Sequence, residues 1–424
     1  GSQSQAQATT GEFNTSLGAL SMGAGVTTGD NNVAAGYQAL ENVTSGSSNI
    51  MMGAFAGHGL TGGANNIGVG HGALQVEDGH GNNVAVGHLA LSTLNAGADA
   101  YNVAMGFQAA RLVSTGVQNV IIGGFAGDAI TTATSNVAIG YEALSTEDTM
   151  GTAVAIGYRA LKTQNSASAA YNVAVGYDAG KAVTTGQGNV LVGGLAGDAI
   201  NSGSGNVCIG NQAGSAISTA SENVVIGQYA GDALTIGTSN VAVGTEALST
   251  SVDGDHNTAI GYKALEDYED GDGNGHNTAV GSISQLNAST GEFNTSLGSR
   301  SMGVGLTTGD DNVAVGYQAG LALTGGFRNI LIGVNSGDAL TTGTKNIAIG
   351  YDALGTEDTH GFNVAIGSSA LATLNAGADA HNVAIGNAAG YAMTTGKENA
   401  LVGSSAGDAL TTGVRNVAIG YNAL

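Results

Sequence analysis

The chain has 424 residues, of which 73 are glycine and none is proline, and only 10% are charged. A net charge of −22 argues against a nucleic-acid partner and an anionic membrane surface, and no 18-residue apolar run predicts a membrane span. A hydrophobic content of 42% is too high for a disordered chain, and glycine without proline excludes collagen.

One short pattern recurs 24 times along the chain, from residue 14 to residue 416, usually at a spacing of 17 residues. The first position is Asn in every copy except that of Ala153, and the fifth is always Gly. The second position is Val, Ile or Thr in every copy except that of Ala400. A period near 17 is too short for a pair of helices and suits one coil of a β-solenoid. The sequence predicts an all-β fold, a parallel β-solenoid of about 24 coils that forms one continuous array over residues 1–424.

The copy "NVAIGYEAL", which begins at Asn136, shows what each coil is expected to do. Because side chains alternate along a strand, Val137 and Ile139 share one face, and we expect that face to fill the interior while Ala138 points outward. Gly140 ends the strand where a positive φ or a close backbone approach is needed. Asn136 is interpreted as one rung of a ladder of amides, or as a contact to a glycan; the ladder better explains its presence in 23 coils.

A longer period of 70 residues overlies the coils, and one coil of each set carries "AGDA" or a close variant of it. In these coils the third position is large, at Met51, Ile121, Leu191, Leu331 and Leu401. On a face expected to point outward, bulky apolar residues at regular intervals predict contact with a neighbouring chain.

A third period of 280 residues relates "GEFNTSLG" at residue 11 to the same letters at residue 291. The chain begins and stops within a coil and shows no polar capping coil. Because open coil ends expose strand edges and apolar interior, we expect self-association, as a parallel homotrimer or an end-to-end filament.

The coil with the longest turn contains an acidic loop, "EDYEDGDGNGHN", at residues 266–277. Asp270, Asp272 and Asn274 have the spacing of the first half of a calcium loop, although the Glu expected at position twelve is replaced by Gly281. Asp253 and Asp255 lie one coil earlier and are candidates for further ligands. The loop is either a calcium site or a solvated acidic turn.

The remaining polar residues do not predict an enzyme. The eight histidines show no HExxH spacing, and the helix that a GxSxG nucleophile elbow requires has no place in this repeat. The acidic pairs Glu77–Asp78 and Glu357–Asp358 are interpreted as solvated turns rather than the carboxylate pair of a glycan-cleaving enzyme. Cys208 replaces an alanine and is expected to fill a packed slot. Threonine pairs form no unbroken array over consecutive coils, which disfavours an ice-binding face.

The copies "NTAIGYKAL" at residue 257 and "NVAVGYQAG" at residue 312 resemble the repeat of YadA-like head domains in trimeric autotransporter adhesins. They are also similar to arrays in phage tail fibres and bacterial surface proteins. The resemblance implies a left-handed parallel β-roll, a parallel trimer and a host-surface or glycan receptor. It also implies that Val137 and Ile139 fill the roll and that Ala138 faces outward. The sequence thus predicts a non-enzymatic extracellular fibre or adhesin segment, with a phage tail-fibre shaft or receptor-binding segment as the alternative.

Overall fold

The structure is a computed structural model that describes all residues except 1, 6–8, 24–25, 148, 150, 269–274 and 304. The described residues contain 24 strands of three residues each and no helix. The strands are β1 (Thr15–Leu17), β2 (Val33–Ala35), β3 (Ile50–Met52), β4 (Ile67–Val69), β5 (Val84–Val86), β6 (Val103–Met105), β7 (Val120–Ile122), β8 (Val137–Ile139), β9 (Val154–Ile156), β10 (Val173–Val175), β11 (Val190–Val192), β12 (Val207–Ile209), β13 (Val224–Ile226), β14 (Val241–Val243), β15 (Thr258–Ile260), β16 (Thr278–Val280), β17 (Thr295–Leu297), β18 (Val313–Val315), β19 (Ile330–Ile332), β20 (Ile347–Ile349), β21 (Val364–Ile366), β22 (Val383–Ile385), β23 (Ala400–Val402) and β24 (Val417–Ile419). The prediction of an all-β parallel solenoid with a period near 17 residues is confirmed.

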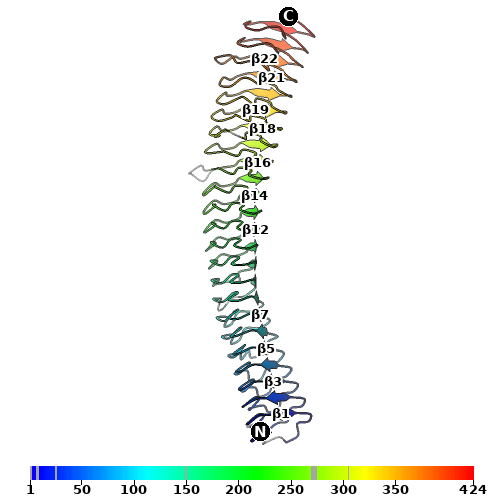
Figure 1. Cartoon of the computed structure of the whole chain (residues 1–424), viewed down its shortest axis with the longest axis vertical. Helices are drawn as coiled ribbons and strands as arrows, with labels where there is room; N and C mark the ends of the chain where they lie inside the picture. Colours follow the sequence, from blue (N-terminus) through cyan, green and yellow to red (C-terminus); the bar gives the residue numbers. More distant parts are fainter. Residues whose placement is uncertain are drawn as a thin grey trace. The chain divides into compact units, whose positions relative to one another are not determined.

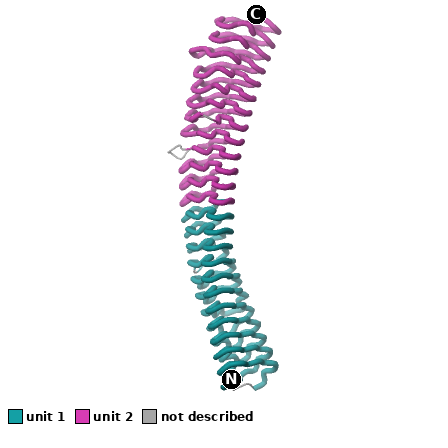
Figure 2. Tube along the Cα trace, viewed as in Figure 1, with its two compact units in different colours: residues 1–208 teal, residues 209–424 magenta. Residues whose placement is uncertain are grey.

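The chain divides into two compact units, which are coloured separately in Figure 2: unit 1 spans residues 1–208 and unit 2 spans residues 209–424. In unit 1, strands β1 to β11 pair in sequence order, each parallel to the next. In unit 2, strands β13 to β24 do the same. Within each unit the strands therefore lie one above another, one for each coil (Figure 1).

Neighbouring strands pair in register, so that like residues stack on like residues. Val137, Ala138 and Ile139 of β8 pair with Val154, Ala155 and Ile156 of β9. Each coil therefore extends columns of equivalent side chains, and the position of a residue in its coil determines its neighbours.

The interior of the coil is the reverse of the sequence prediction. Ala138 is completely buried, whereas Val137 and Ile139 are only partly buried and face outward. Ala143 and Leu144, on the segment that follows the strand, are also completely buried. Leu144 fills most of the space inside this thin coil. We infer that this is why the inward position of the strand has room only for a small side chain. The prediction that Val137 and Ile139 fill the interior is wrong.

The large residues at the third position also point inward. Ile121, Leu191, Leu331 and Leu401 are at most 1% exposed in the single chain, so the prediction that they form an interface is wrong. Glycine leaves the space that these side chains occupy. A Cβ on Gly180 would lie 2.6 Å from Leu191 Cδ1, and one on Gly197 would lie 2.8 Å from Leu191 Cδ2. The 70-residue period is therefore a core-packing pattern, in which a larger strand residue is matched by glycine after the strand.

Candidate functional site

The first position of each coil forms a buried polar ladder. Asn119 accepts a hydrogen bond at Oδ1 from the backbone N–H of Asn136, at 3.0 Å, and its Nδ2 donates to Asn102 Oδ1 and to the Ala133 carbonyl. Equivalent asparagines repeat these bonds, and their side chains are almost completely buried. Each amide therefore satisfies buried backbone groups of neighbouring coils, which is a structural role.

The ladder changes at Ala153, the one copy without asparagine. Ala153 N–H still donates to Asn136 Oδ1 at 3.0 Å, but Asn136 Nδ2 has no hydrogen-bond partner among the described residues. On the other side, Asn172 Nδ2 donates to Gln164 Oε1, and Gln164 Nε2 donates to Glu147 Oε2. Gln164 therefore takes up the bonding that an asparagine at position 153 would provide.

Gly140 lies where the backbones of adjacent coils approach each other closely. Its φ is +135°, and a Cβ at this position would lie 2.2 Å from the carbonyl oxygen of Gly157. No other residue type fits such an approach without a backbone shift, which explains why the fifth position is glycine in all copies.

Each unit has an apolar outer strand face, defined here as the second and fourth positions of the repeat, which are the first and last residues of each strand. These positions carry Val, Ile, Leu, Met or Thr, with the exceptions Ala35 and Ala400. Ile332 is 37% exposed and Ile385 is 38% exposed, although coils above and below cover the flanks of each column. The strand residues include no Asp, Glu, Lys or Arg. Contiguous uncharged surfaces of this kind mark interaction sites in soluble proteins.

Unit 1 also carries a continuous column of nine rings just after the strands. The rings are those of Tyr37, Phe55, His71, His88, Phe107, Phe125, Tyr141, Tyr158 and Tyr177. Successive centroids are 5.2 to 6.0 Å apart. Tyr158 is 40% exposed and Tyr177 is 55% exposed, and these two rings stack face to face, whereas four other pairs of the column meet edge to face. Sequence reasoning missed this column because three ring types fill it.

Two turns bring a histidine and two acidic residues together: Glu77, Asp78 and His80 in unit 1, and Glu357, Asp358 and His360 in unit 2. In each turn the three ligand-type atoms lie within 4.8 Å of one another. Glu77 and Glu357 are completely buried, so their interpretation as solvated turns is wrong. The signal that would have found them is the recurrence of Glu at one coil position, at 77, 147 and 357.

Two open pockets lie beside the "AGDA" coils. A pocket of about 370 Å³ in unit 1 is lined by Asp128, Glu142 and Lys162 among others, and one of about 460 Å³ in unit 2 by Asp232, Glu246 and Glu266. At both pockets a lining glutamate pairs with a lysine: Glu142 with Lys162 at 2.6 Å, and Glu246 and Glu266 with Lys263 at 2.9 Å. Each of these glutamates is therefore engaged in an ion pair with a lysine. None of them forms the isolated pair of carboxyl groups that would act as acid and base.

The predicted calcium ligands Asp270, Asp272 and Asn274 lie outside the described residues. Of the two further candidates, Asp255 accepts hydrogen bonds at Oδ1 from the N–H and hydroxyl of Thr238, at 2.5 and 3.1 Å. Asp253 has a buried Oδ1 without a hydrogen-bond partner among the described residues. Calcium binding therefore stays a prediction. Cys208 is completely buried, and burial raises the pKa of its thiol to about 12, which fits the packed slot expected for it.

A scan of protein-family models and a search of curated proteins returned no match to this chain. Among the described residues there is no helix with the length and apolar character needed to cross a membrane. The resemblance to YadA-like repeats therefore stays a prediction, and the geometry of the outer strand face carries the functional argument.

Proposed function

We propose that the chain is a non-enzymatic structural segment of an extracellular fibre, and that copies of it associate through the outer strand face. The observation that carries the proposal is the exposure of two uncharged, mostly β-branched columns along the strands of each unit. Burying such columns removes apolar surface from water, which stabilises association by about 25 cal/mol for each Å².

The repeat itself favours a second copy as the occupant of this face. A partner that packs against the columns over many coils needs apolar side chains at the same spacing along the stack. A parallel copy provides them, because each coil presents equivalent residues and a symmetric interface matches them coil by coil. The net charge of −22 opposes association in general, but none of that charge lies on the strands.

We favour a parallel homotrimer as the assembly, in line with the resemblance to trimeric autotransporter adhesins. An end-to-end filament is the second arrangement. An adhesive role, with a host-surface or glycan receptor, belongs to the same proposal, and a phage tail-fibre shaft or receptor-binding segment is the alternative. All of these uses need a regular, repeating surface rather than a catalytic centre.

Light scattering coupled to size exclusion, at low micromolar protein, tests the proposal. We expect a particle of about three times the chain mass of 41.2 kDa. The double variant Val364→Glu and Ile366→Glu places two charges on the outer strand face and is expected to yield folded monomers, because unpaired charges are costly to bury in an interface.

The matched control is Thr395→Glu with Thr412→Glu, which adds the same charge to exposed turns of unit 2. This control is expected to keep the wild-type mass. A stable wild-type monomer of 41.2 kDa, or equal dissociation of both double variants, contradicts the proposal.

A further inference from the structure

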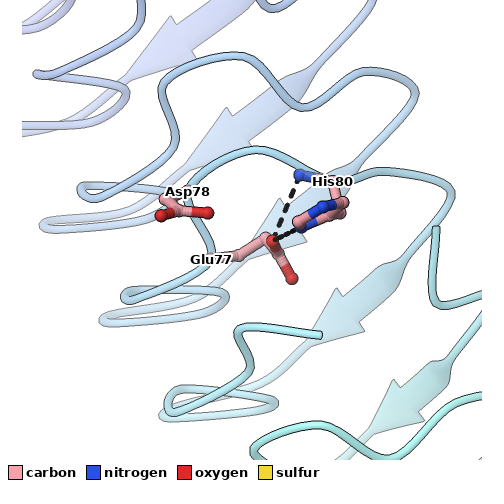
Figure 3. A group of neighbouring side chains, drawn as sticks. All are labelled: Glu77, Asp78 and His80. Atoms are coloured by element: carbon pink, nitrogen blue, oxygen red, sulfur yellow. Dashed lines mark hydrogen bonds and ion pairs between the residues drawn. The ribbon is translucent and has the colours of Figure 1, made fainter. Parts of the chain in front are cut away.

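The turn at Glu77, Asp78 and His80 places a carboxylate and an imidazole against each other inside a coil (Figure 3). His80 N–H donates to Glu77 Oε1 at 3.2 Å, and His80 Nδ1 lies 3.4 Å from the same oxygen. Asp78 is exposed on the solvent side of the turn. Its carbonyl oxygen accepts hydrogen bonds from Thr61 N–H and Gly62 N–H, which fixes the backbone of the turn to the preceding coil.

Two atoms of this turn are buried and make no hydrogen bond to any described residue, although His80 Nδ1 faces Glu77 Oε1. Neither Glu77 Oε2 nor His80 Nδ1 has a hydrogen-bond partner among the described residues. The Glu77 side chain is completely buried, and burial raises the pKa of its carboxyl, whereas the amide and charge of His80 and the amide of Ala96 act in the opposite direction. A buried carboxylate oxygen without a donor is costly unless a cation compensates it.

The spacing of these atoms suits a metal ion better than a hydrogen bond. Two ligands of a tetrahedral zinc ion, each at about 2.0–2.1 Å from the metal, lie about 3.4 Å apart. Glu77 Oε1 and His80 Nδ1 already have this separation. Because Asp78 is exposed, a rotation about its side-chain torsions brings a second carboxylate toward the pair at little cost.

The turn at Glu357, Asp358 and His360 provides an internal comparison, 280 residues later. There the Thr359 hydroxyl contacts both Asp358 Oδ1 and His360 Nδ1, at 3.1 and 3.0 Å. Ala376 N–H donates to Glu357 Oε2 at 3.2 Å, so both oxygens of this carboxylate have partners. In the first turn the equivalent amide of Ala96 also lowers the pKa of Glu77, but Glu77 Oε2 makes no hydrogen bond among the described residues. In the first turn, Gly79 stands in place of Thr359, and no hydroxyl competes for the ligand atoms.

We propose that Glu77, Asp78 and His80 bind a divalent transition-metal ion of the zinc type, with solvent completing the coordination. Imidazole together with carboxylates is a ligand set that zinc accepts, whereas calcium prefers oxygen ligands alone. The turn in unit 2 holds the same ligands in hydrogen bonds of their own and binds zinc more weakly.

Calorimetric titration of the apo protein with Zn²⁺, supported by the visible spectrum of bound Co²⁺, tests the proposal. We expect one tight site per chain, and a loss of affinity on the order of 100-fold in His80→Ala and in Glu77→Gln. The matched variant His360→Ala is expected to keep the tight site. Melting curves in chelator show whether each variant still folds.

A reciprocal exchange sharpens the test. Gly79→Thr introduces the competing hydroxyl and is expected to weaken zinc binding; a Cβ there would meet no atom within 4 Å, so the variant should fold. Thr359→Gly is expected to strengthen binding at the second turn. The proposal is overturned if the chain shows no saturable Zn²⁺ binding, if binding survives His80→Ala, or if only Ca²⁺ binds.

Discussion

Units 1 and 2 share the same interior but differ in the surface that follows the strands. In unit 1 nine rings form an unbroken column, whereas the equivalent positions of unit 2 mix tyrosine with small or polar residues. The interrupting residues include Ser282, Ser299, Ser368, Asn387 and Ser404. Among the described residues of unit 2, no two rings at this position contact each other. The fold therefore does not require the aromatic column.

What both units retain indicates what the fold does require. Each has the buried asparagine ladder, the inward third position and glycine at the fifth position. These three features satisfy buried polar groups, fill the thin core and allow close backbone approach. The comparison predicts that interior substitutions have similar effects in the two units and that substitutions in the aromatic column do not.

The largest effect is expected at the inward position of the strand. Ala138→Asp in unit 1 and Ala365→Asp in unit 2 each bury an unpaired carboxylate, and we expect both to lower the free energy of unfolding by about 3–5 kcal/mol. Val137→Asp, on the outer strand face, is expected to cost less than about 1 kcal/mol in the dissociated chain. Urea unfolding at low protein concentration measures these values, and a larger loss for Val137→Asp than for Ala138→Asp would refute the assigned orientation.

The ladder is expected to give the next largest effect, again equal in the two units. Asn119→Ala and Asn329→Ala each leave buried donors and acceptors without partners, at a cost of about 1–3 kcal/mol. Asn387→Ala, at an exposed position, is the control and is expected to change stability by less than about 0.5 kcal/mol. If the ladder variants matched this control, the asparagines would need a role other than stabilising the coil.

The aromatic column is where the two units should differ. Phe107 contacts His88 and Phe125, each at a centroid distance of 5.2 Å, whereas Tyr351 in unit 2 contacts no ring at the equivalent position. Phe107→Ser is therefore expected to cost about 1–2 kcal/mol, from two ring pairs, and Tyr351→Ser less than about 0.5 kcal/mol. Equal losses in thermal melts of the two variants would show that the column contributes no stacking energy.

The smallest effect concerns two equivalent aspartates, Asp198 in "AGDA" and Asp338 in "SGDA". Burial raises the pKa of both Asp198 and Asp338; Lys181 opposes the shift at Asp198, whereas Asp352 adds to it at Asp338. With a folded-state pKa above the unfolded value, the folded chain binds more protons, so stability falls as pH rises through the folded-state pKa. Asp338→Asn is expected to stabilise the chain at pH 7 by up to about 0.5 kcal/mol, more than Asp198→Asn, with no gain below the ordinary pKa of Asp. Melting temperatures measured from pH 3 to pH 7 check the order, and a gain that persists unchanged at pH 3 would contradict it.

The repeat could be predicted from sequence because a fixed period needs no knowledge of packing. The orientation of the strand side chains could not be predicted, because their alternation shows only that Val137 and Ile139 share a face. It does not show whether that face lies inside the coil. The deciding feature is Leu144, which occupies the core from outside the strand and leaves room only for Ala138. The coil of Ile121 carried the same information. It has Gly127 at the position of Leu144, so a larger residue in the strand is paired with a smaller residue after it.

The zinc site was out of reach of motif searches for a different reason. Glu77 and His80 are three residues apart on a turn, a spacing that a solvated acidic loop also shows. Only the coil geometry buries Glu77 and turns His80 Nδ1 inward. Burial of a charged residue depends on the path of the whole coil, so local sequence alone did not reveal it.

Thiol labelling across one strand tests the central claim, that the outer strand face is the associating surface, most directly. In a Cys208→Ala background, single cysteines replace Val364, Ala365 or Ile366 of β21. We expect cysteines at 364 and 366 to react quickly in dilute protein and slowly in concentrated protein, because assembly covers them. The cysteine at 365, like native Cys208, is expected to stay unreactive at every concentration until the chain unfolds. Faster labelling at 365 than at 364 and 366 in the folded protein, or rates at 364 and 366 that are independent of concentration, would contradict the account.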